Sequence, residues 1–198
     1  PVTSLVALLS VVSLAVSLAV QSVLSNIAGG LVILVTKPFQ LGDLVETADG
    51  LGTVKEISLT FTKLETPDGL WLMTPNSVLS SGKITNYTAL GRRRAEIRVG
   101  ASYDAAVSDV RAACLDAAAR VPGVLPDPAP IVYVDSYGES SISYIVRVWC
   151  RSEDYTDVYY GLTEGLKAAF DEHGVEMPYN HLNIHILDQT EQKEKQTV

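Results

Sequence analysis

The chain has 198 residues and a net charge of −8, which allows one large domain, or two small ones beside a membrane segment. The acidic balance argues against a dedicated nucleic-acid-binding protein, because such proteins need a basic surface and Arg92-Arg93-Arg94 is the only basic cluster. The two cysteines, Cys114 and Cys150, form no CxxC motif and are expected to be buried free thiols.

The N-terminal part of the chain carries no charge, since all 15 basic and 23 acidic residues lie after Thr36. Residues 2–20 are apolar or small on every side, so a helix there is either buried in a large core or spans a bilayer. We favour the bilayer, because the remaining chain is too small to enclose such a helix and about 20 residues cover roughly 30 Å of hydrocarbon. The start at Pro1, without a basic n-region, predicts no signal peptide and further membrane helices upstream in a longer polypeptide.

Two neighbouring stripes run along this predicted helix. The small stripe consists of Ser10, Ser13 and Ser17. The larger stripe consists of Ala7, Val11, Leu14 and Leu18. Small residues permit close approach of helices in lipid, so a ring of helices packed through the serine stripe would point the other stripe at the ring axis.

The apolar run is interrupted between Gln21 and Asn26, where polar residues fit poorly inside a bilayer. The next run, Ile27 to Val35, is too short to span a membrane alone, and Gly29-Gly30 adds flexibility. We therefore predict a bend near residues 21–26 and a second helix near the membrane interface. Lys37-Pro38 ends that helix, because proline cannot continue it.

Residues 41–87 read as a small all-β domain of roughly five short strands. Asp49-Gly50 and Pro67-Asp68-Gly69 mark turns. Residues 57–62 alternate apolar and polar side chains, which predicts a half-buried strand, and the change of parity at Leu64 indicates a bulge near Thr62-Lys63. Residues 70–74 are a further predicted strand.

The last part, residues 92–187, follows the order βαββαβ, the ferredoxin-like split arrangement. Its predicted strands lie at residues 95–99, 131–134, 142–150 and 182–186. Asp104 is the expected cap of the first helix, and His173-Gly174 ends the second. The tail from Asp188 is polar and is predicted to be disordered.

Catalytic motifs are missing from the sequence: it contains no HExxH, GxSxG, P-loop or GxGxxG pattern. His181 and His185 would lie well apart on a strand, so we expect no metal site and no cofactor. Trp71 and Trp149 are expected to be packing residues. A membrane helix that carries two soluble modules without an active site suggests a channel, an anchor or a receptor, and not an enzyme.

A series of short motifs runs in order through residues 5–187. It consists of Leu14-Ala-Val-Ser-Leu18-Ala-Val-Gln21, Leu24-Ser-Asn-Ile-Ala-Gly-Gly30, Lys37-Pro-Phe-Gln-Leu-Gly-Asp43, Gly52-Thr-Val54 with Ile57, Thr66-Pro-Asp-Gly69, Pro75-Asn76, Ile84-Thr-Asn-Tyr87, Val99-Gly-Ala-Ser-Tyr-Asp104, Arg147-Val-Trp149 and Pro178-Tyr179. The series resembles the small-conductance mechanosensitive channel (MscS) family, and its order makes the resemblance specific.

This resemblance implies a membrane α segment followed by cytosolic β and α+β domains, assembled as a homoheptamer around a hollow vestibule. The implied parts are a kinked pore-lining transmembrane helix at 1–36 with its bend near 21–26 and an interfacial second half, a Sm-like small β-barrel domain at 37–90, a ferredoxin-like βαββαβ domain at 91–181, a C-terminal strand of an oligomeric β-barrel at 182–187, and a polar tail at 188–198.

The resemblance also implies roles for single residues of the helix. They are Leu14 and Leu18 as the pore gate, Ala7 and Val11 as pore lining, Ser10, Ser13 and Ser17 as helix-packing residues, and Gln21, Ser22, Asn26 and Gly30 as hinge or kink positions. The family's model members carry glycine where this chain has its serines at positions 10, 13, 17 and 22. Serine is small enough for close packing, but it permits fewer backbone conformations at the kink.

The implied function is a channel that membrane tension opens to release ions and small solutes during hypoosmotic shock. Two leucine rings about 6 Å apart along the axis would exclude water until they widen. The implied partners are identical subunits, membrane lipids and permeating solutes, with no nucleic acid. The implied location is the inner membrane of a bacterium or archaeon, with the C-terminal domains in the cytoplasm.

Two other functions are compatible with the sequence. A membrane-tethered Sm-like module could bind RNA, although the acidic balance disfavours it. A non-conducting oligomeric scaffold would use the same architecture without a pore, and the position of Leu14 and Leu18 relative to a central axis discriminates between scaffold and channel.

Overall fold

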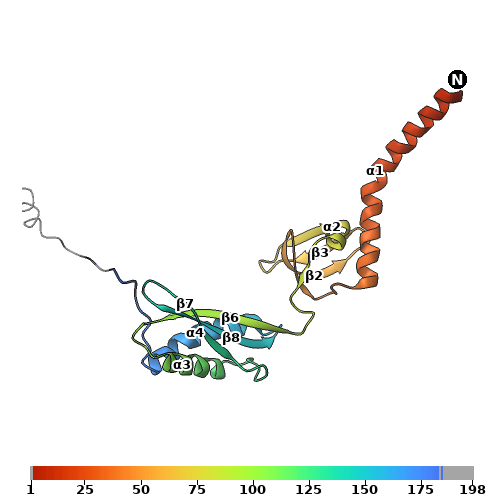
Figure 1. Ribbon diagram of the computed structural model, residues 1–198. Coiled ribbons are helices and arrows are strands. Elements are labelled where there is room, and N and C mark those ends of the chain that lie inside the picture. The colour runs from red at the N-terminus through yellow and green to blue at the C-terminus, as the bar shows by residue number, and fades with distance from the viewer. Residues whose placement is uncertain (1, 183, 185–198) are drawn as a thin grey trace, which may run out of the picture. The chain divides into compact units, whose positions relative to one another are not determined.

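The computed structural model describes residues 2–182 and 184, and the chain divides into two compact units, with the boundary in the sequence between Arg93 and Arg94. Unit 1 holds the long N-terminal helix and a small antiparallel sheet, and unit 2 holds a second sheet with two helices (Figure 1). Each unit has its own hydrophobic core.

Unit 1 begins with α1 (Val2–Thr36), which is one uninterrupted helix. A separate second helix was therefore a wrong prediction, although Figure 1 shows the axis of α1 changing direction along its length. The helix ends at Thr36, as the Lys37-Pro38 signal predicted. Lys37 adopts a left-handed backbone with φ of 48°, and its N–H still donates to the Ile33 carbonyl at 2.9 Å.

The sheet of unit 1 has five strands in the order β4-β3-β2-β1-β5, and each neighbouring pair is antiparallel. The strands are β1 (Leu44–Thr47), β2 (Gly50–Ile57), β3 (Phe61–Glu65), β4 (Trp71–Pro75) and β5 (Thr85–Asn86), with the short helix α2 (Asn76–Ser81) after β4. The core of the unit lies between α1 and the sheet. It contains Ile33, Phe39, Val45, Val54, Leu64 and Leu79.

Two details of this sheet differ from the sequence prediction. The alternation over residues 57–62 does not form a strand, because the chain turns between Ile57 and Phe61, and the Ser58 N–H donates to the Phe61 carbonyl at 2.9 Å. The bulge lies on β2 and not on β3: Val54 pairs with Leu64 and Glu56 with Lys63, which leaves the residue between them on β2 as the extra one.

Unit 2 packs two helices on one face of a three-stranded sheet with the order β6-β8-β7 (Figure 1). Its elements are β6 (Arg92–Ala101), α3 (Val107–Arg120), β7 (Ile131–Tyr137), β8 (Ile142–Arg151) and α4 (Tyr155–Glu172). The core between helices and sheet includes Val110, Tyr144 and Phe170, each fully buried. The helix α4 ends at the predicted position, where Gly174 has a left-handed φ of 66°.

Several predictions for unit 2 can be compared with the structure. Cys114 and Cys150 are buried free thiols, as expected, and burial raises the pKa of the Cys114 thiol to about 12. Asp104 does not cap α3, because the helix begins only at Val107 after Ala106, and no side chain caps it. The strand expected at 182–187 falls mostly outside the described residues, and the described Leu182 and Ile184 lie in no strand.

Candidate functional site

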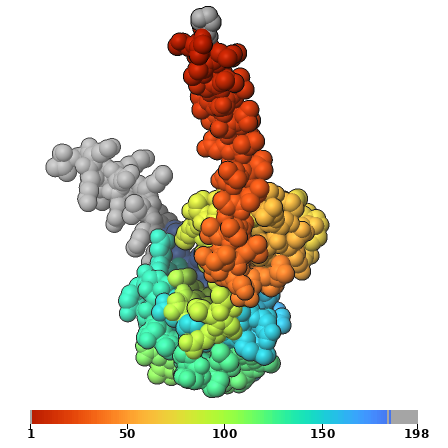
Figure 2. Space-filling model, turned by 90° about the vertical axis from the view of Figure 1, so that its right-hand side faces the viewer, coloured from red at the N-terminus to blue at the C-terminus, as the bar shows by residue number. Residues whose placement is uncertain are grey.

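The N-terminal half of α1 stands free of the rest of unit 1. Every side chain from Val2 to Ser25 is exposed, including Val11 (65%), Leu14 (61%) and Leu18 (61%). Figure 2 shows this half as a column that projects from the unit. Soluble monomers rarely expose a continuous apolar surface of this size, so a bilayer or further copies of the chain must cover it.

Two serines on this half, Ser10 and Ser17, bond their hydroxyls within the helix. Ser10 Oγ donates to the Val6 carbonyl at 2.8 Å, and Ser17 Oγ donates to the Ser13 carbonyl at 2.8 Å. An apolar environment therefore meets no unpaired hydroxyl at these two positions. The serine stripe is small and uncharged, and two of its three hydroxyls are bonded within the helix, which suits close packing against another helix.

The polar segment between Gln21 and Asn26 remains helical, and the Asn26 side chain finds partners both within the helix and on α2. Asn26 Nδ2 donates to the Ser22 carbonyl at 3.0 Å, and Asn26 Oδ1 accepts from the backbone N–H of Ser77 at 3.0 Å. Ser77 lies 51 residues further along the chain. Asn26 is thus the first residue of α1 whose side chain bonds to the sheet unit, while Gln21 and Ser22 remain exposed.

A hollow of about 510 Å³ lies along one face of α1, over the turns from Ser17 to Ala28. It is lined by Ser17, Leu18, Val20, Gln21, Leu24, Ser25 and Ala28. All of these residues belong to one helix, so the hollow is open to whatever covers α1 on that side.

At Gly29 and Gly30 the backbone of α1 comes close to the rest of unit 1. A Cβ at Gly29 would lie 2.6 Å from the Asn76 carbonyl oxygen, and a Cβ at Gly30 would lie 2.4 Å from the Leu59 carbonyl oxygen. No side chain fits at either distance, and both glycines are buried. In this structure Gly30, a predicted hinge, is therefore a closely packed contact point within a continuous helix.

Asn76 is the centre of this junction and was missed as a functional residue by the sequence analysis. Its side chain is fully buried: Oδ1 accepts from Thr62 Oγ1 at 2.8 Å, and Nδ2 donates to the carbonyls of Ser58 at 2.8 Å and Leu59 at 3.1 Å. The amide thereby fixes the turn between β2 and β3 against α1. In the sequence this residue is visible only as part of the family motif Pro75-Asn76.

Asp43 secures the segment where α1 passes into the sheet. Its carboxylate accepts from the Gln40 N–H at 2.8 Å, Asn86 Nδ2 at 2.8 Å and Thr88 Oγ1 at 2.9 Å. Burial alone would raise the pKa of Asp43, but the bonds from Asn86, Gln40 and Thr88 outweigh it, and the pKa lies below its ordinary value. The C-terminal half of α1 is thus held at its start, its middle and its exit.

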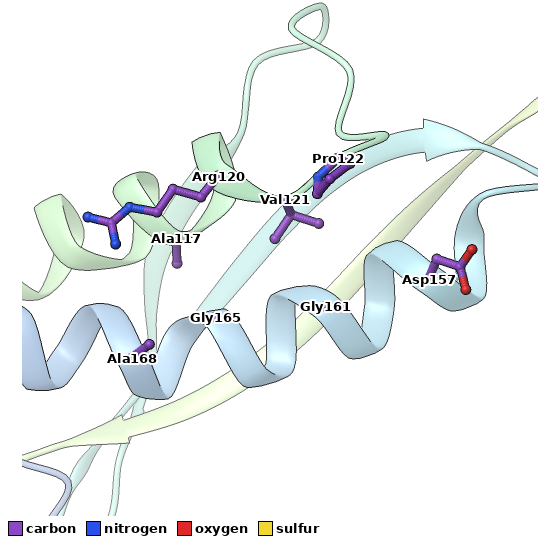
Figure 3. Close-up of a pocket in the computed structure, with 8 residues that line it drawn as sticks. All are labelled: Ala117, Arg120, Val121, Pro122, Asp157, Gly161, Gly165 and Ala168. Carbon is purple, nitrogen blue, oxygen red and sulfur yellow. The ribbon is translucent and has the colours of Figure 1, made fainter.

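Unit 2 contains a groove of about 300 Å³ between α3 and α4. Its floor includes Gly161 and Gly165, and Figure 3 shows Arg120 and Asp157 at opposite ends. Arg120 is already paired with Asp116 and with Glu172, at 2.5 Å and 2.7 Å. Within residues 2–182 and 184, no three His, Cys, Asp or Glu side chains gather as a metal site would require. Arg120, one of the two charged residues that line the groove, is engaged in ion pairs with Asp116 and Glu172.

A long, uncharged and exposed helix that is long and apolar enough to cross a membrane, and whose second half is bonded to a folded sheet unit, is typical of a membrane protein with a folded domain outside the bilayer. The comparisons with known proteins agree. The family model "Mechanosensitive ion channel, beta-domain" matches residues 22–89, and "Mechanosensitive ion channel MscS, C-terminal" matches residues 95–177. The chain belongs to the MscS family of mechanosensitive channels.

Relatives and solved structures support the same assignment. The chain is 33% identical to the small-conductance mechanosensitive channel of Edwardsiella ictaluri over 87% of this chain and 60% of that protein. It is 30% identical to the Helicobacter pylori channel over 96% of this chain and 70% of that protein. The crystal structure of Helicobacter pylori MscS in its closed state superposes with a TM-score of 0.88, covering 94% of this chain and 74% of that one.

Family membership has two direct consequences. The chain has the MscS fold and belongs to a family of channels and not of enzymes. It is a protein of the inner membrane of a bacterium or archaeon, and the apolar helix α1 fits this location. The chain spans about 60% of the length of the Edwardsiella relative.

Proposed function

We propose that the chain is the pore-lining and cytosolic part of a mechanosensitive channel subunit that opens under membrane tension and releases ions and small solutes during hypoosmotic shock. The observation that carries this proposal is the contrast within α1. Its first half, Val2 to Ser25, is uncharged and uncovered, while its second half is held to a folded unit. A helix with this contrast requires neighbours in the membrane and transmits force to a soluble anchor.

Identical subunits are the simplest neighbours, and we propose a homoheptamer with lipids on its outer side. Close packing through Ser10, Ser13 and Ser17 turns the stripe of Ala7, Val11, Leu14 and Leu18 toward the axis. Rings of Leu14 and Leu18 would stand about 6 Å apart. A narrow apolar constriction of this kind loses its water and blocks hydrated ions.

Tension favours the state with the larger area in the membrane plane, because the bilayer interacts differently with the two states. Widening the rings requires the free half of α1 to tilt relative to the anchored half. Bending between Gln21 and Asn26 leaves the junction intact, whereas bending at Gly30 must open its contact with Leu59. The junction therefore favours bending between Gln21 and Asn26. Gly30 remains a proposed second hinge, for states in which its contact with Leu59 has opened.

The soluble parts complete the proposal. Unit 1 supplies a Sm-like β domain, and unit 2 supplies a ferredoxin-like domain. The predicted fourth strand of unit 2 and the predicted barrel strand fall on the same segment, 182–187, which lies largely outside the described residues. Together these domains form a cytoplasmic vestibule through which solutes reach the pore.

The test is tension-activated conductance of the full-length parent protein in giant membrane patches, with Leu18→Ser compared with Val16→Ser. Both positions are exposed, but Val16 lies on the opposite side of the helix from the leucine stripe. A polar residue at the gate admits water, so Leu18→Ser is expected to open at lower tension, and Val16→Ser at the tension of the wild type. Absence of conductance at every tension from protein that is present and assembled would replace the channel with the scaffold.

A further inference from the structure

The chain enters the sheet of unit 1 and leaves it at neighbouring points. The entry is the exit segment of α1, residues 37–43, which leads into β1. The departure is a linker, residues 87–93, which follows β5 and ends at the boundary with unit 2. Because β1 and β5 pair directly, and the Tyr87 N–H donates to the Leu44 carbonyl at 2.9 Å, the exit segment and the linker lie side by side within unit 1.

One carboxylate joins the exit segment to β5 and to the linker. Asp43 Oδ2 accepts from the Gln40 N–H and from Asn86 Nδ2, both at 2.8 Å. The other oxygen, Oδ1, accepts from Thr88 Oγ1 at 2.9 Å. Asn86 Nδ2 also donates to the Pro38 carbonyl at 3.4 Å. Hydrogen bonds to an ionised acceptor are about twice as strong as those between neutral groups, so this shared acceptor is a firm connection.

The Thr88 hydroxyl is the part of the linker that bonds directly to this carboxylate. It donates to Asp43 and accepts from the Leu44 N–H at 3.2 Å, so it is engaged as donor and as acceptor. Asn86 Oδ1 lies 3.1 Å from the same hydroxyl. The carboxylate oxygen is closer and charged, and it is therefore the stronger acceptor for the one hydroxyl proton.

The first residues of the linker are held in a turn. Asn86 Oδ1 accepts from the N–H groups of Thr88 and Ala89, each at 3.0 Å, and the Gly91 N–H donates to the Thr88 carbonyl at 2.9 Å. Gly91 has a left-handed φ of 67°, which a residue with a side chain rarely adopts. The beginning of the linker is thus a bonded turn that is attached to Asp43.

The far end of the linker folds back onto unit 1. The Arg93 guanidinium carbon lies 4.5 Å from the centroid of the Tyr87 ring, and the Tyr87 hydroxyl donates to Glu46 Oε2 on β1 at 2.6 Å. The linker is therefore fastened at both of its ends. A displacement of the exit segment passes to the linker unless the bonds at Asp43 break.

We infer that Asp43, Asn86 and Thr88 form a staple that makes the exit of α1 and the linker to unit 2 move together, with Thr88 as the positioning residue on the linker. This inference rests on the proposed function, in which tension moves α1. The staple carries a change in the pore helix to the chain that enters β6. Coupling between two sites typically changes an equilibrium by about 5- to 150-fold, so its loss is measurable.

The experiment is hydrogen exchange of the full-length parent protein in liposomes, with and without swelling by an osmotic gradient. A small dye trapped in the same liposomes reports opening. In the wild type, swelling should release the dye and raise the exchange rate of the linker amides by about fivefold or more. In Thr88→Val, which lacks the hydroxyl, swelling should still release the dye, but linker exchange should change by less than about twofold.

Two further variants separate coupling from simple stability. Thr88→Ser keeps the hydroxyl and should restore the response of the linker to swelling. Thr163→Val is the matched control, because Thr163 Oγ1 donates to the Tyr159 carbonyl within α4 at 2.8 Å, and it should behave as the wild type. A purely structural role of Thr88 would raise linker exchange in resting liposomes and leave the response to swelling intact.

Dye release from the wild type without a change in linker exchange overturns the staple, and so does an equal rise in wild type and Thr88→Val. If Thr88→Val opens unit 1 as a whole, seen as fast exchange in β2 and β3, Asp43→Asn takes its place, because it removes the charge and keeps an oxygen for Gln40. Asp43→Asn should likewise abolish the linker response. A wild type that is present and assembled but releases no dye would remove the proposed function, and not the staple alone.

Discussion

The two halves of α1 have similar composition and opposite surroundings. From Val2 to Ser25 the helix is exposed on every side, and the hydroxyls of Ser10 and Ser17 bond within the helix. From Asn26 onward it is bonded through Ser77, buried at Gly29, Gly30 and Ile33, and then secured at Asp43. The difference shows that apolar character alone does not decide where a helix packs within its own chain. The second half of α1 is held to the rest of unit 1 because Gly29 and Gly30 have no side chains and because the Asn26 side chain bonds to Ser77.

Adding a side chain at Gly30 should have the largest effect, because it disrupts the packing that distinguishes the second half of α1 from the first. In Gly30→Ala the new Cβ meets the Leu59 carbonyl oxygen at 2.4 Å, so either α1 or the β2–β3 turn must move. We expect a loss of about 3 kcal/mol in the free energy of local opening, measured by hydrogen exchange at the amides of α2 and β3.

Gly161→Ala is the matched control, because it is also a helical glycine and its new Cβ meets only Val121 Cγ1 at 3.5 Å. Alanine is the better helix former, so the free energy of local opening in this variant should stay unchanged or rise by up to about 1 kcal/mol. Equal protection in wild type and Gly30→Ala would show that the junction is loose.

Asn76→Ala should have the next largest effect. It removes the amide that bonds Thr62, Ser58 and Leu59, and it leaves a buried hydroxyl and two carbonyls without this partner. We expect a loss of about 2 kcal/mol in local opening free energy at the same amides, since an unsatisfied buried group costs about 1–3 kcal/mol. Asn180→Ala, an exposed asparagine in unit 2, is the control and should leave these amides unchanged. A loss confined to α4 would contradict the role of Asn76.

The smallest effect is a pH dependence at the exit of α1. The pKa of Asp43 lies below its ordinary value, so its ionised form stabilises the folded state at neutral pH, and this contribution is lost as pH falls below about 4 toward the folded-state pKa. Asp43→Asn should therefore be less stable than wild type by about 1 kcal/mol at pH 7, and the difference should shrink toward pH 3. Thermal unfolding of the detergent-solubilised proteins at both pH values measures it. A constant difference across this range would mean that the Asp43 charge is not involved.

The sequence predicted the parts of this contrast that depend on local chemistry. Absence of charge before Thr36 predicted the exposed apolar helix, and Lys37-Pro38 predicted its end. The junction could not be predicted, because its bonds join residues far apart in the chain, such as Asn26 and Ser77. The turn at Ser58 to Thr60 was concealed because Ile57, Leu59 and Phe61 keep the alternation of a strand across it. In fact the Leu59 side chain is exposed, and the backbone carbonyl of Leu59 accepts a hydrogen bond from the Asn76 side chain.

The central claim is that the leucine stripe of the free half of α1 faces a pore, and thiol modification under tension tests it most directly. Leu18→Cys and Val16→Cys are compared in patches of the full-length parent protein exposed to a water-soluble cationic thiosulfonate. Buried Cys114, with its pKa raised to about 12, should not react. The account predicts that the reagent changes the current through Leu18→Cys only while tension holds the channel open, and leaves Val16→Cys unchanged. Modification of Val16→Cys with no effect at Leu18→Cys would contradict it, because the opposite face of α1 would then line the pore.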